Sequence, residues 1–386
     1  MASQPARATD RPLRVLLVTE AAGGGVGRHV LDLAQGLITA GHRVDVAWSP
    51  GRAEPGFIRA LDAIDGLHPH SLPMARAPGP GDLSAVLALR RLMGRAGPFD
   101  LVHGHSSKAG ALVRLAVAGR GIPAIYTPHA FVTLDPDLGP LPRAVYGLAE
   151  RLLAAWGARV ICVSEEERAH ALSLGIRAAR LAVIPNGISP LPPADRPGAR
   201  ARLGLPDATP CVGFVGRLSA QKAVDRLIRA FALAPGSQQA QLVIVGEGAE
   251  RMALESLARD LGIADRTRFT GQEDGVALMA GFDIFVLPSR YEGFPYVLLE
   301  AASRGLPILT MAVGGAGVVV EQGGNGYVVP QAGGVAAMAE RLGLLLGDPG
   351  LRRGMAKRSL ERAAGFTARN MVVATVALYR EVLGSR

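Results

Sequence analysis

The sequence predicts an α/β protein with two doubly wound, Rossmann-like domains that face each other across a cleft. Short apolar runs of strand length alternate with amphipathic stretches of helix length, which is the pattern of parallel sheets with helices on both faces. The alternation pauses at a proline-rich segment near the middle of the chain. The chain has 386 residues, of which 49% are hydrophobic, and this length suits about two domains.

The first half of the chain supplies the first predicted sheet. Each unit of the pattern is a β-branched run, a turn containing glycine or proline, and a helical stretch. We expect strands at 14–19, 43–48, 100–105, 124–128, 159–163 and 181–184. Amphipathic helices are expected at 28–40, 82–95, 108–119 and 143–156.

The segment 188–200 (ISPLPPADRPGAR) separates this series from a second one, because proline interrupts both helices and strands. The second series predicts strands at 211–215, 241–245, 267–271, 283–287, 307–311 and 326–329. An amphipathic helix is expected at 367–383. Ligands of doubly wound sheets bind at the carboxyl ends of the strands, so functional residues are expected in the turns that follow them.

Composition and charge exclude several classes of protein. The net charge of +9 is spread evenly, with 20 basic against 15 acidic residues in 1–190 and 22 against 18 in the rest, so no nucleic-acid footprint is predicted. A diffuse positive field suits phosphate-bearing ligands, an anionic membrane surface, or simple use of arginine. The two cysteines, Cys162 and Cys211, are expected to be buried thiols. Since neither a signal peptide nor a membrane-spanning run is visible, we expect a cytoplasmic protein.

A glycine-rich turn, 23–27 (GGGVG), follows the first strand and precedes a helix expected from about Arg28. Glycines let a backbone approach a ligand closely, and a helix start favours anions. A dinucleotide-binding motif would need glycine where Arg28 stands and an acidic residue within 47–51 (AWSPG), so a nicotinamide enzyme is disfavoured. A tight turn and a substrate contact both remain open.

Two cations follow the strand expected at 211–215. Arg217 offers a planar fork for phosphate oxygens, and Lys222 a mobile point charge, so the pair could grip a diphosphate. The alternative is a surface pair between Lys222 and Asp225.

Two carboxylates flank a predicted helix start. Pro295 is placed as an early helical residue, so Glu292 precedes the helix and Glu300 lies about one turn inside it. A helix start binds phosphate and carboxylates accept hydrogen bonds from hydroxyl groups, which together suit a sugar nucleotide. The alternative is structural, with Glu292 complementing the helix dipole and Glu300 pairing with Arg304.

All eight histidines fall in the first domain, and His103, His105 and His129 end predicted strands. His129 is the best candidate for a site. No metal site is predicted, because no acidic partner with ligand spacing accompanies these histidines. His68 and His70 are interpreted as surface or loop residues.

Together these segments resemble the family 4 retaining glycosyltransferases of the GT-B fold. The resemblance covers essentially the whole chain after residue 13, and the order and spacing of its segments are jointly specific. It rests on GGGVGRHV (23–30), HGHSSKAG (103–110), YTPHAF (126–131), VIPNGI (183–188), GRLSAQK (216–222), VGEG (245–248), FTG (269–271), EGFPYVLLEA (292–301), VGG (313–315) and NGYVVP (325–330).

The resemblance implies catalytic roles for four residues. Arg217 and Lys222 would bind the donor's diphosphate and stabilise charge on the leaving nucleotide in place of a metal ion. Glu292 would hold hydroxyls of the transferred sugar, and His129 would lie beside that sugar. The leaving phosphate would help to deprotonate the acceptor, so no general base is assigned to the protein.

The resemblance also implies binding residues and domain limits. Glu300 would hold the ribose hydroxyls, and a loop of the first domain (Gly24, Gly25 and Gly27) would face acceptor and phosphate. The other donor-binding residues would be Gly216, Gly246, Gly248, Thr270, Gly293, Phe294 and Pro295. The domains would be 1–187 on the acceptor side and 188–365 on the nucleotide-sugar side, with 366–386 packing back on the first. Gly317-Val318 stands where many relatives carry Pro-Glu, and Glu321 is a candidate to take over part of that role.

The predicted function is transfer of a hexose from a nucleotide-diphosphate sugar, UDP being preferred over GDP, without a cofactor. The style of the segments indicates exopolysaccharide or cell-envelope assembly, with a saccharide or polyprenyl-diphosphate-linked acceptor. Arg143, Arg151 and Arg159 bracket an apolar helix and permit peripheral contact with the inner face of the plasma membrane. The alternatives are a GT-B-fold epimerase or phosphorylase, and an inactive partner of a polysaccharide assembly complex.

Overall fold

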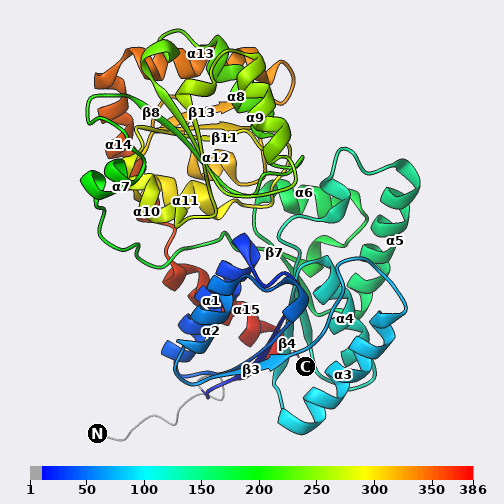
Figure 1. Ribbon diagram of the computed structural model, residues 1–386. Helices are drawn as coiled ribbons and strands as arrows, with labels where there is room; N and C mark the ends of the chain where they lie inside the picture. Colours follow the sequence, from blue (N-terminus) through cyan, green and yellow to red (C-terminus); the bar gives the residue numbers. More distant parts are fainter. Residues whose placement is uncertain (1–10, 386) are drawn as a thin grey trace, which may run out of the picture. The chain divides into compact units, whose positions relative to one another are not determined.

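A computed structural model describes residues 11–385, which form two compact units (Figure 1). The N-terminal unit comprises residues 11–189 and 368–385, and the C-terminal unit comprises 190–367. The sequence places these limits at 187/188 and 365/366. Residues 1–10 and 386, which belong to the predicted first domain and terminal segment, lie outside the described residues.

The N-terminal unit is a parallel sheet with helices on both faces (Figure 1). Among the described residues its sheet has seven strands in the order β3-β2-β1-β4-β5-β6-β7. The strands are β1 (Arg14–Thr19), β2 (Arg43–Trp48), β3 (Leu67–Ser71), β4 (Leu101–His105), β5 (Ala124–Thr127), β6 (Arg159–Cys162) and β7 (Leu181–Val183). The helices are α1 (Gly24–Thr39), α2 (Pro55–Asp62), α3 (Gly81–Ala96), α4 (Ser107–Val117), α5 (Pro140–Trp156), α6 (Glu165–Ser173) and α15 (Ala368–Gly384).

Strand β1 shows why these strands are continuously apolar. Val15 and Leu17 belong to a core cluster that includes residues of α1, α2 and α15, whereas Leu16 and Val18 belong to a second cluster with α3 and α4. All four side chains are fully buried. Because successive side chains of a strand point to opposite faces, a strand covered on both faces must be apolar at every position.

The edge strand β3 was not predicted: His68 is exposed, which fits the interpretation as a surface residue, but it and the half-buried His70 lie on a strand and not in a loop. Its sequence, LHPHS, contains Pro69, which cannot donate to a neighbouring strand and is therefore confined to an edge. His70 lies 2.8 Å, Nε2 to Oδ1, from Asp45 of β2. This polar contact helps to attach a strand that has little apolar pattern of its own.

The terminal helix α15 packs against α1 (Figure 1). A side chain at Gly36 would place its Cβ 2.4 Å from Val372, so glycine is needed for this close helix contact. Tyr379 is buried, and its hydroxyl lies 2.7 Å from His103 Nδ1.

The C-terminal unit repeats the architecture. In the described chain its parallel sheet has six strands in the order β10-β9-β8-β11-β12-β13. They are β8 (Cys211–Val215), β9 (Gln241–Val245), β10 (Thr267–Gly271), β11 (Ile284–Leu287), β12 (Ile308–Met311) and β13 (Gly326–Val329). The helices are α7 (Arg196–Arg202), α8 (Val224–Leu233), α9 (Arg251–Asp260), α10 (Gly275–Leu278), α11 (Tyr296–Ser303), α12 (Ala316–Val319), α13 (Gly334–Gly347) and α14 (Pro349–Ala363).

Both units are parallel, doubly wound sheets, which confirms the predicted fold class. Both cysteines are buried thiols, as predicted. Two predicted details at helix starts are wrong. Helix α1 begins at Gly24, not near Arg28, and Pro295 precedes α11 with an extended backbone instead of lying inside the helix. Among the described residues, no helix combines the length and apolar character that crossing a bilayer requires.

Candidate functional site

The strand order of each sheet locates its ligand-binding edge. The order reverses between β1 and β4 in one unit and between β8 and β11 in the other. At such a switch point the loops leave in opposite directions and open a crevice at the carboxyl ends of the strands. The predicted functional residues follow these strands or the strands beside them, so each unit carries a half-site that can be described by itself.

Lys222 and Glu292 form the centre of the C-terminal half-site. Lys222 Nζ lies 2.6 Å from Glu292 Oε1, although the two predicted residues are 70 positions apart. The side chains of Lys222 and Glu292 are only 19% and 11% exposed. Lys222 therefore does not make the surface pair with Asp225 that was the alternative interpretation. A cation and a carboxylate are held side by side between the loops that follow β8 and β11.

The backbone around Gln221 positions this pair. Gln221 Nε2 donates to Tyr291 O at 3.1 Å, and Arg290 N donates to Gln221 O at 2.9 Å. The residues immediately before Lys222 and Glu292 are thus bound to each other. Arg217 lies in the same loop after β8 and is exposed.

Two of the predicted donor-binding glycines, Gly246 and Gly248, allow close backbone packing. A Cβ at Gly246 would lie 1.9 Å from Gly216 O, and one at Gly248 would lie 2.0 Å from Leu218 O. Leu218 N donates to Glu247 O at 2.9 Å, which joins the loops after β8 and β9. This contact accounts for Gly246 and Gly248 without a ligand, and it fixes the loop that carries Gly216 and Arg217.

The start of α11 is held in a similar way. A Cβ at Gly314 would lie 2.5 Å from Glu292 O and Gly293 O, so the loops after β11 and β12 touch. Phe294 is buried, and a Cβ on Gly315 would lie 2.4 Å from its ring. These contacts set the direction in which α11 leaves the sheet, and Glu300 lies half-buried on that helix.

The hydrogen bonds of Thr270 and Glu321 indicate different roles for the two predicted residues. Thr270, at the end of β10, is half-buried, and its hydroxyl donates to Gly271 O at 3.1 Å. Glu321 Oε2 accepts hydrogen bonds from Arg358 at 2.8 Å and Arg362 at 3.4 Å, both on α14. The carboxylate of Glu321 therefore ties α14 to the loop before β13, which is a structural role.

In the N-terminal unit, the glycine-rich segment is the first turn of α1. Gly24 and Gly25 are exposed, and Gly27 is buried close to Phe57. Gly24 N donates to Glu54 Oε2 at 3.2 Å, so a carboxylate of the chain itself lies at this helix start. A carboxylate of the chain thus competes with any anion at this helix start, and the contact of the glycine loop with acceptor and phosphate stays a prediction.

Three histidines meet at the carboxyl edge of the N-terminal sheet. His105 Nδ1 lies 3.1 Å from His129 Nε2, and the ring centroids of His29 and His129 are 4.5 Å apart. Ring nitrogens of all three lie within 4.8 Å of one another. A tetrahedral zinc ion with ligands at about 2.1 Å needs nitrogens about 3.4 Å apart, whereas His105 Nδ1 and His129 Nε2 lie at 3.1 Å and within hydrogen-bonding distance of each other.

Burial keeps these imidazoles neutral. It lowers the pKa of His29 to about 4, although a hydrogen bond with Asn186 opposes the shift. Burial, with neighbouring imidazoles second, also lowers the pKa of His103, His105 and His129 well below the usual value. A neutral imidazole can both donate and accept a hydrogen bond, which suits contact with a sugar hydroxyl.

The backbone at His129 is strained, and a hydrogen bond to a residue far away in the sequence holds it in place. His129 and the next residue, Ala130, have φ values of 58° and 101°, in the region that favours glycine. Ala130 N donates to Glu167 Oε1 and Val163 N donates to Glu167 Oε2, each at 2.7 Å. Burial raises the pKa of Glu167 to about 7 despite these hydrogen bonds. Strain of this kind concentrates at functional sites, which supports the choice of His129.

Sequence reasoning missed three residues of the N-terminal half-site: His29, Glu54 and Glu167. His29 follows the glycine-rich segment by two positions, and its place on the inward face of α1 is a usable signal. The carboxylates of Glu54 and Glu167 accept hydrogen bonds from backbone N–H groups that lie far away in the sequence. Nothing in the local pattern of either glutamate distinguishes it from an ordinary surface carboxylate.

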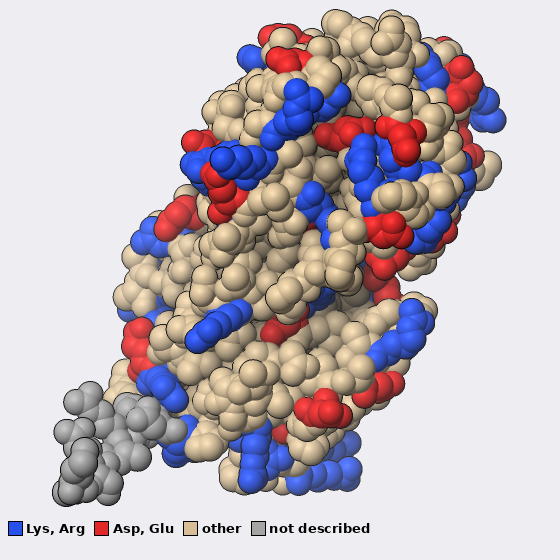
Figure 2. Space-filling model, turned by 90° about the vertical axis from the view of Figure 1, so that its left-hand side faces the viewer, with Lys and Arg blue, Asp and Glu red and all other residues tan. Residues whose placement is uncertain are grey.

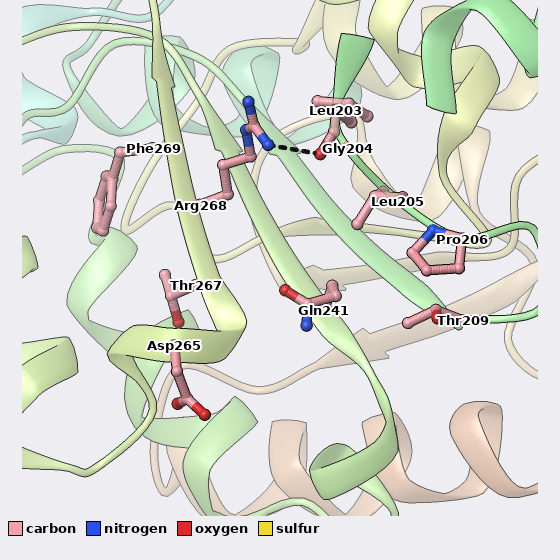
Figure 3. Close-up of a pocket in the computed structure, with 10 residues that line it drawn as sticks. All are labelled: Leu203, Gly204, Leu205, Pro206, Thr209, Gln241, Asp265, Thr267, Arg268 and Phe269. Carbon is pink, nitrogen blue, oxygen red and sulfur yellow. Dashed lines mark hydrogen bonds between the residues drawn. The ribbon is translucent and has the colours of Figure 1, made fainter. Parts of the chain in front are cut away.

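A cavity of about 550 Å³ lies elsewhere in the C-terminal unit (Figure 3). Its lining includes Gln241 and Thr267, which begin β9 and β10, so it lies toward the amino ends of these strands. Arg268 Nη1 donates to Leu203 O at 2.8 Å across this region (Figure 3). The cavity contains neither Lys222 nor Glu292 and is not the predicted donor site.

Charge alone singles out no binding face in the view of Figure 2. Lys and Arg side chains are interspersed there with Asp and Glu, and broad uncharged areas separate them. The half-sites are therefore recognised from strand order and side-chain contacts.

The two parallel, doubly wound units have the GT-B fold of solved glycosyltransferases. Sucrose-phosphate synthase from Thermosynechococcus elongatus has this fold, with a TM-score of 0.81 and 24% identity, and the match covers 97% of this chain and 100% of that one. HepE from Anabaena, solved in complex with UDP-glucose, matches with a TM-score of 0.80 and 23% identity over the same shares. WaaG, a glycosyltransferase involved in lipopolysaccharide biosynthesis, matches with a TM-score of 0.75 and 22% identity, over 94% of this chain and 99% of that one.

Sequence comparison establishes the family. Residues 24–187 match the glycosyl transferase 4-like domain, and residues 195–362 match glycosyl transferases group 1. D-inositol 3-phosphate glycosyltransferase from Nocardia farcinica is 31% identical over 373 residues, which cover 89% of this chain and 82% of the relative. The corresponding enzyme from Kribbella flavida is 29% identical over 417 residues, covering 97% of each. The chain belongs to the group 1 glycosyltransferases, which confirms the predicted resemblance, and its activity is sugar transfer.

Proposed function

We propose that this enzyme is a retaining hexosyltransferase whose donor is a nucleotide-diphosphate hexose, with UDP preferred over GDP. The observation that carries the proposal is the pair of Lys222 and Glu292, which holds a cation and a carboxylate at the switch point of the C-terminal sheet. A diphosphate needs the cation, and sugar hydroxyls need the carboxylate. The UDP and UDP-glucose complexes of HepE, which shares the fold, are consistent with such a donor.

In this proposal each site residue binds a different part of the donor. Lys222 and Arg217 neutralise the diphosphate as the sugar–phosphate bond breaks, which is the point of greatest charge development. Glu292 holds hydroxyls of the hexose, and Glu300 holds those of the ribose. The base lies near Thr270, and the loop backbone from Gly293 to Pro295 borders the phosphates. The proposal assigns no metal ion, since Lys222 and Arg217 supply the counter-charge.

The reaction exchanges one bond for another on the same face of the sugar. The bond from the anomeric carbon to the diphosphate oxygen breaks, and a bond to the acceptor oxygen forms. The acceptor's proton passes to the departing diphosphate. His129, whose pKa desolvation lowers although the side chain is only half-buried, contacts a hydroxyl of the sugar or the reacting centre as a neutral imidazole.

For the acceptor we propose a saccharide on a polyprenyl diphosphate, in cell-envelope or exopolysaccharide assembly. WaaG, which shares the fold, is involved in lipopolysaccharide biosynthesis. A second candidate is a phosphorylated inositol, which the names of the curated relatives suggest. The carboxylate of Glu54 at the start of α1 disfavours a phosphate there, and it therefore favours an acceptor that presents neutral hydroxyls to Gly24 and Gly25.

The test is transfer from UDP- and GDP-hexoses to a lipid-linked saccharide and to inositol 3-phosphate, in buffer containing EDTA. We expect nucleotide release that depends on the lipid-linked saccharide, with an α-configured donor yielding an α-linked product. Transfer to inositol 3-phosphate alone would replace the proposed acceptor. Interconversion of the sugar without transfer would indicate an epimerase, and binding without turnover an inactive partner.

A further inference from the structure

The outer side of α5 carries a row of exposed, large apolar side chains. Leu141, Val145, Leu148, Leu152 and Trp156 are 56–74% exposed. Their spacing of three or four residues puts them on one side of the helix, where at 1.5 Å per residue the row runs for about 22 Å. These five residues are called the α5 apolar face below. The helix lies at the outer margin of the N-terminal unit (Figure 1).

A buried polar contact holds the α5 apolar face outward. On the opposite side of the helix, Glu150 Oε2 accepts a hydrogen bond from Arg114 Nη2, and Glu150 Oε1 accepts one from the Tyr126 hydroxyl, each at 2.9 Å. Arg114 and Glu150 are both buried. Rotating the helix to hide its apolar face would separate these charges, which is costly in a protein interior. The exposure is therefore a property of the fold and not of a loosely attached helix.

The charges that border this face are basic. Arg151 is exposed in the second half of the helix, whereas Arg143 near its start is half-buried, and its Nη2 donates to the Asp135, Pro136 and Leu138 carbonyls of the preceding loop. Arg180 Nη1 donates to Gly157 O at 2.7 Å, so another guanidinium lies at the end of α5. Glu150 is the acidic residue of the helix, and it is buried and paired. Exposed carboxylates nearby, such as Asp137, lie in the preceding loop.

We propose that the α5 apolar face docks the N-terminal unit onto the surface of an anionic phospholipid membrane. The apolar side chains would enter the boundary between headgroups and acyl chains, while the bordering arginines would meet lipid phosphates. Trp156, near the end of the row, is the residue type that membrane interfaces favour.

Charge decides between a membrane and a second copy of the chain. Two copies packed through this face would bring Arg151 against apolar groups or another arginine, because α5 exposes no carboxylate to pair with it. Lipid phosphates supply that partner. The proposal stands apart from the donor and the acceptor, since its test measures vesicle binding and not sugar transfer.

The test is flotation of the full chain with vesicles of phosphatidylcholine alone or mixed with phosphatidylglycerol. We expect the wild type to float with the anionic vesicles and release in high salt. The double variant Leu148→Ser, Leu152→Ser should bind at least about tenfold more weakly, because withdrawing even one leucine from water contributes about that factor. Arg151→Glu should weaken binding to anionic vesicles several-fold.

Leu83→Ser is the matched control, because Leu83 is a 69% exposed leucine on α3, outside the α5 apolar face. It should bind vesicles like the wild type, and all variants should keep the wild-type melting temperature. Failure of the wild type to float, or an equal loss in the Leu83 variant, would overturn the proposal. A wild-type dimer in light scattering that the double variant dissociates would assign the face to a second copy.

Discussion

Lys222 and Glu292 illustrate how a functional arrangement depends on single residues. Each was predicted by its chemistry, but as a partner of a different part of the donor. Their contact at 2.6 Å makes them one unit, so the position of the carboxylate proposed to bind the sugar depends on the cation proposed to bind the diphosphate. Effects of changing the two residues should therefore not add.

We predict that Lys222→Ala lowers kcat/KM by about 10²-fold or more, because it removes a charge that stabilises the transition state. Glu292→Ala should have an effect of similar size. The double variant should lose less than the product of the two single losses, measured by initial rates of nucleotide release. Lys357→Ala, which changes an exposed lysine on α14, is the control and should be silent. Fully multiplicative losses would contradict the coupling.

Residue types could be predicted from the sequence, but their contacts could not. Arg217, Lys222 and Glu292 were identifiable because each is a charged residue in a loop that follows a predicted strand, and doubly wound sheets bind their ligands at the carboxyl ends of the strands. Glu167 was not, since its function is to accept hydrogen bonds from two backbone N–H groups, one of them 37 positions away. Only the folded backbone shows that this glutamate holds the strained segment at His129.

In helix α5, a polar contact decides which side of the helix is buried. Its apolar residues alone would turn inward, and sequence periodicity does predict a helix here. The orientation instead follows Glu150, which pairs with Arg114 inside the unit. Arg114 also lies over the ring of Tyr126 at 4.3 Å, so the three side chains form one buried cluster.

We predict that Glu150→Ala lowers the free energy of unfolding by about 3–5 kcal/mol, because it leaves the buried Arg114 charge without its carboxylate. Urea denaturation followed by circular dichroism measures this. Glu150→Gln should cost less, since it can keep a hydrogen bond to Tyr126. Glu340→Ala, at an exposed carboxylate on α13, should be close to neutral. A loss below about 1 kcal/mol for Glu150→Ala would contradict the anchoring role.

Most elements could be predicted because both sheets bury apolar strands on both faces. The exceptions have physical reasons. β3 is an edge strand whose Pro69 and histidines hide the usual pattern. α1 starts early because Gly27 N reaches Gly23 O at 3.0 Å and Glu54 caps Gly24, which offsets the poor helix propensity of glycine.

For the molecule as a whole, the buried histidines link stability to pH. A histidine whose pKa is lower in the folded state stays neutral there, while the unfolded chain takes up a proton. For His29 this holds from the usual pKa of 6.5 down to about 4. The stabilising contribution of each such histidine is therefore complete above pH 6.5 and falls as the pH drops through this window, by up to about 1.4 kcal/mol per pH unit. The carboxyl of Glu167, whose pKa burial raises to about 7, acts in the opposite sense, as one group against several histidines.

We predict that the wild type loses stability between pH 7 and pH 5 and that His29→Asn loses less over the same interval. Urea denaturation at the two pH values gives the comparison. His68→Gln, at an exposed position on β3, should keep the wild-type pH dependence. An unchanged pH dependence in His29→Asn would show that His29 does not carry the effect.

We propose that the loops after β8 and β11 bind a sugar nucleotide through Lys222. Calorimetric titration of UDP, GDP and their hexose conjugates into the wild type and Lys222→Ala, without added metal, measures this binding directly. We expect one nucleotide series to bind the wild type selectively and Lys222→Ala to bind it at least about tenfold more weakly, since charge-assisted hydrogen bonds contribute about that much. Absence of nucleotide binding by the wild type, or equal affinity in the variant, would contradict the proposal.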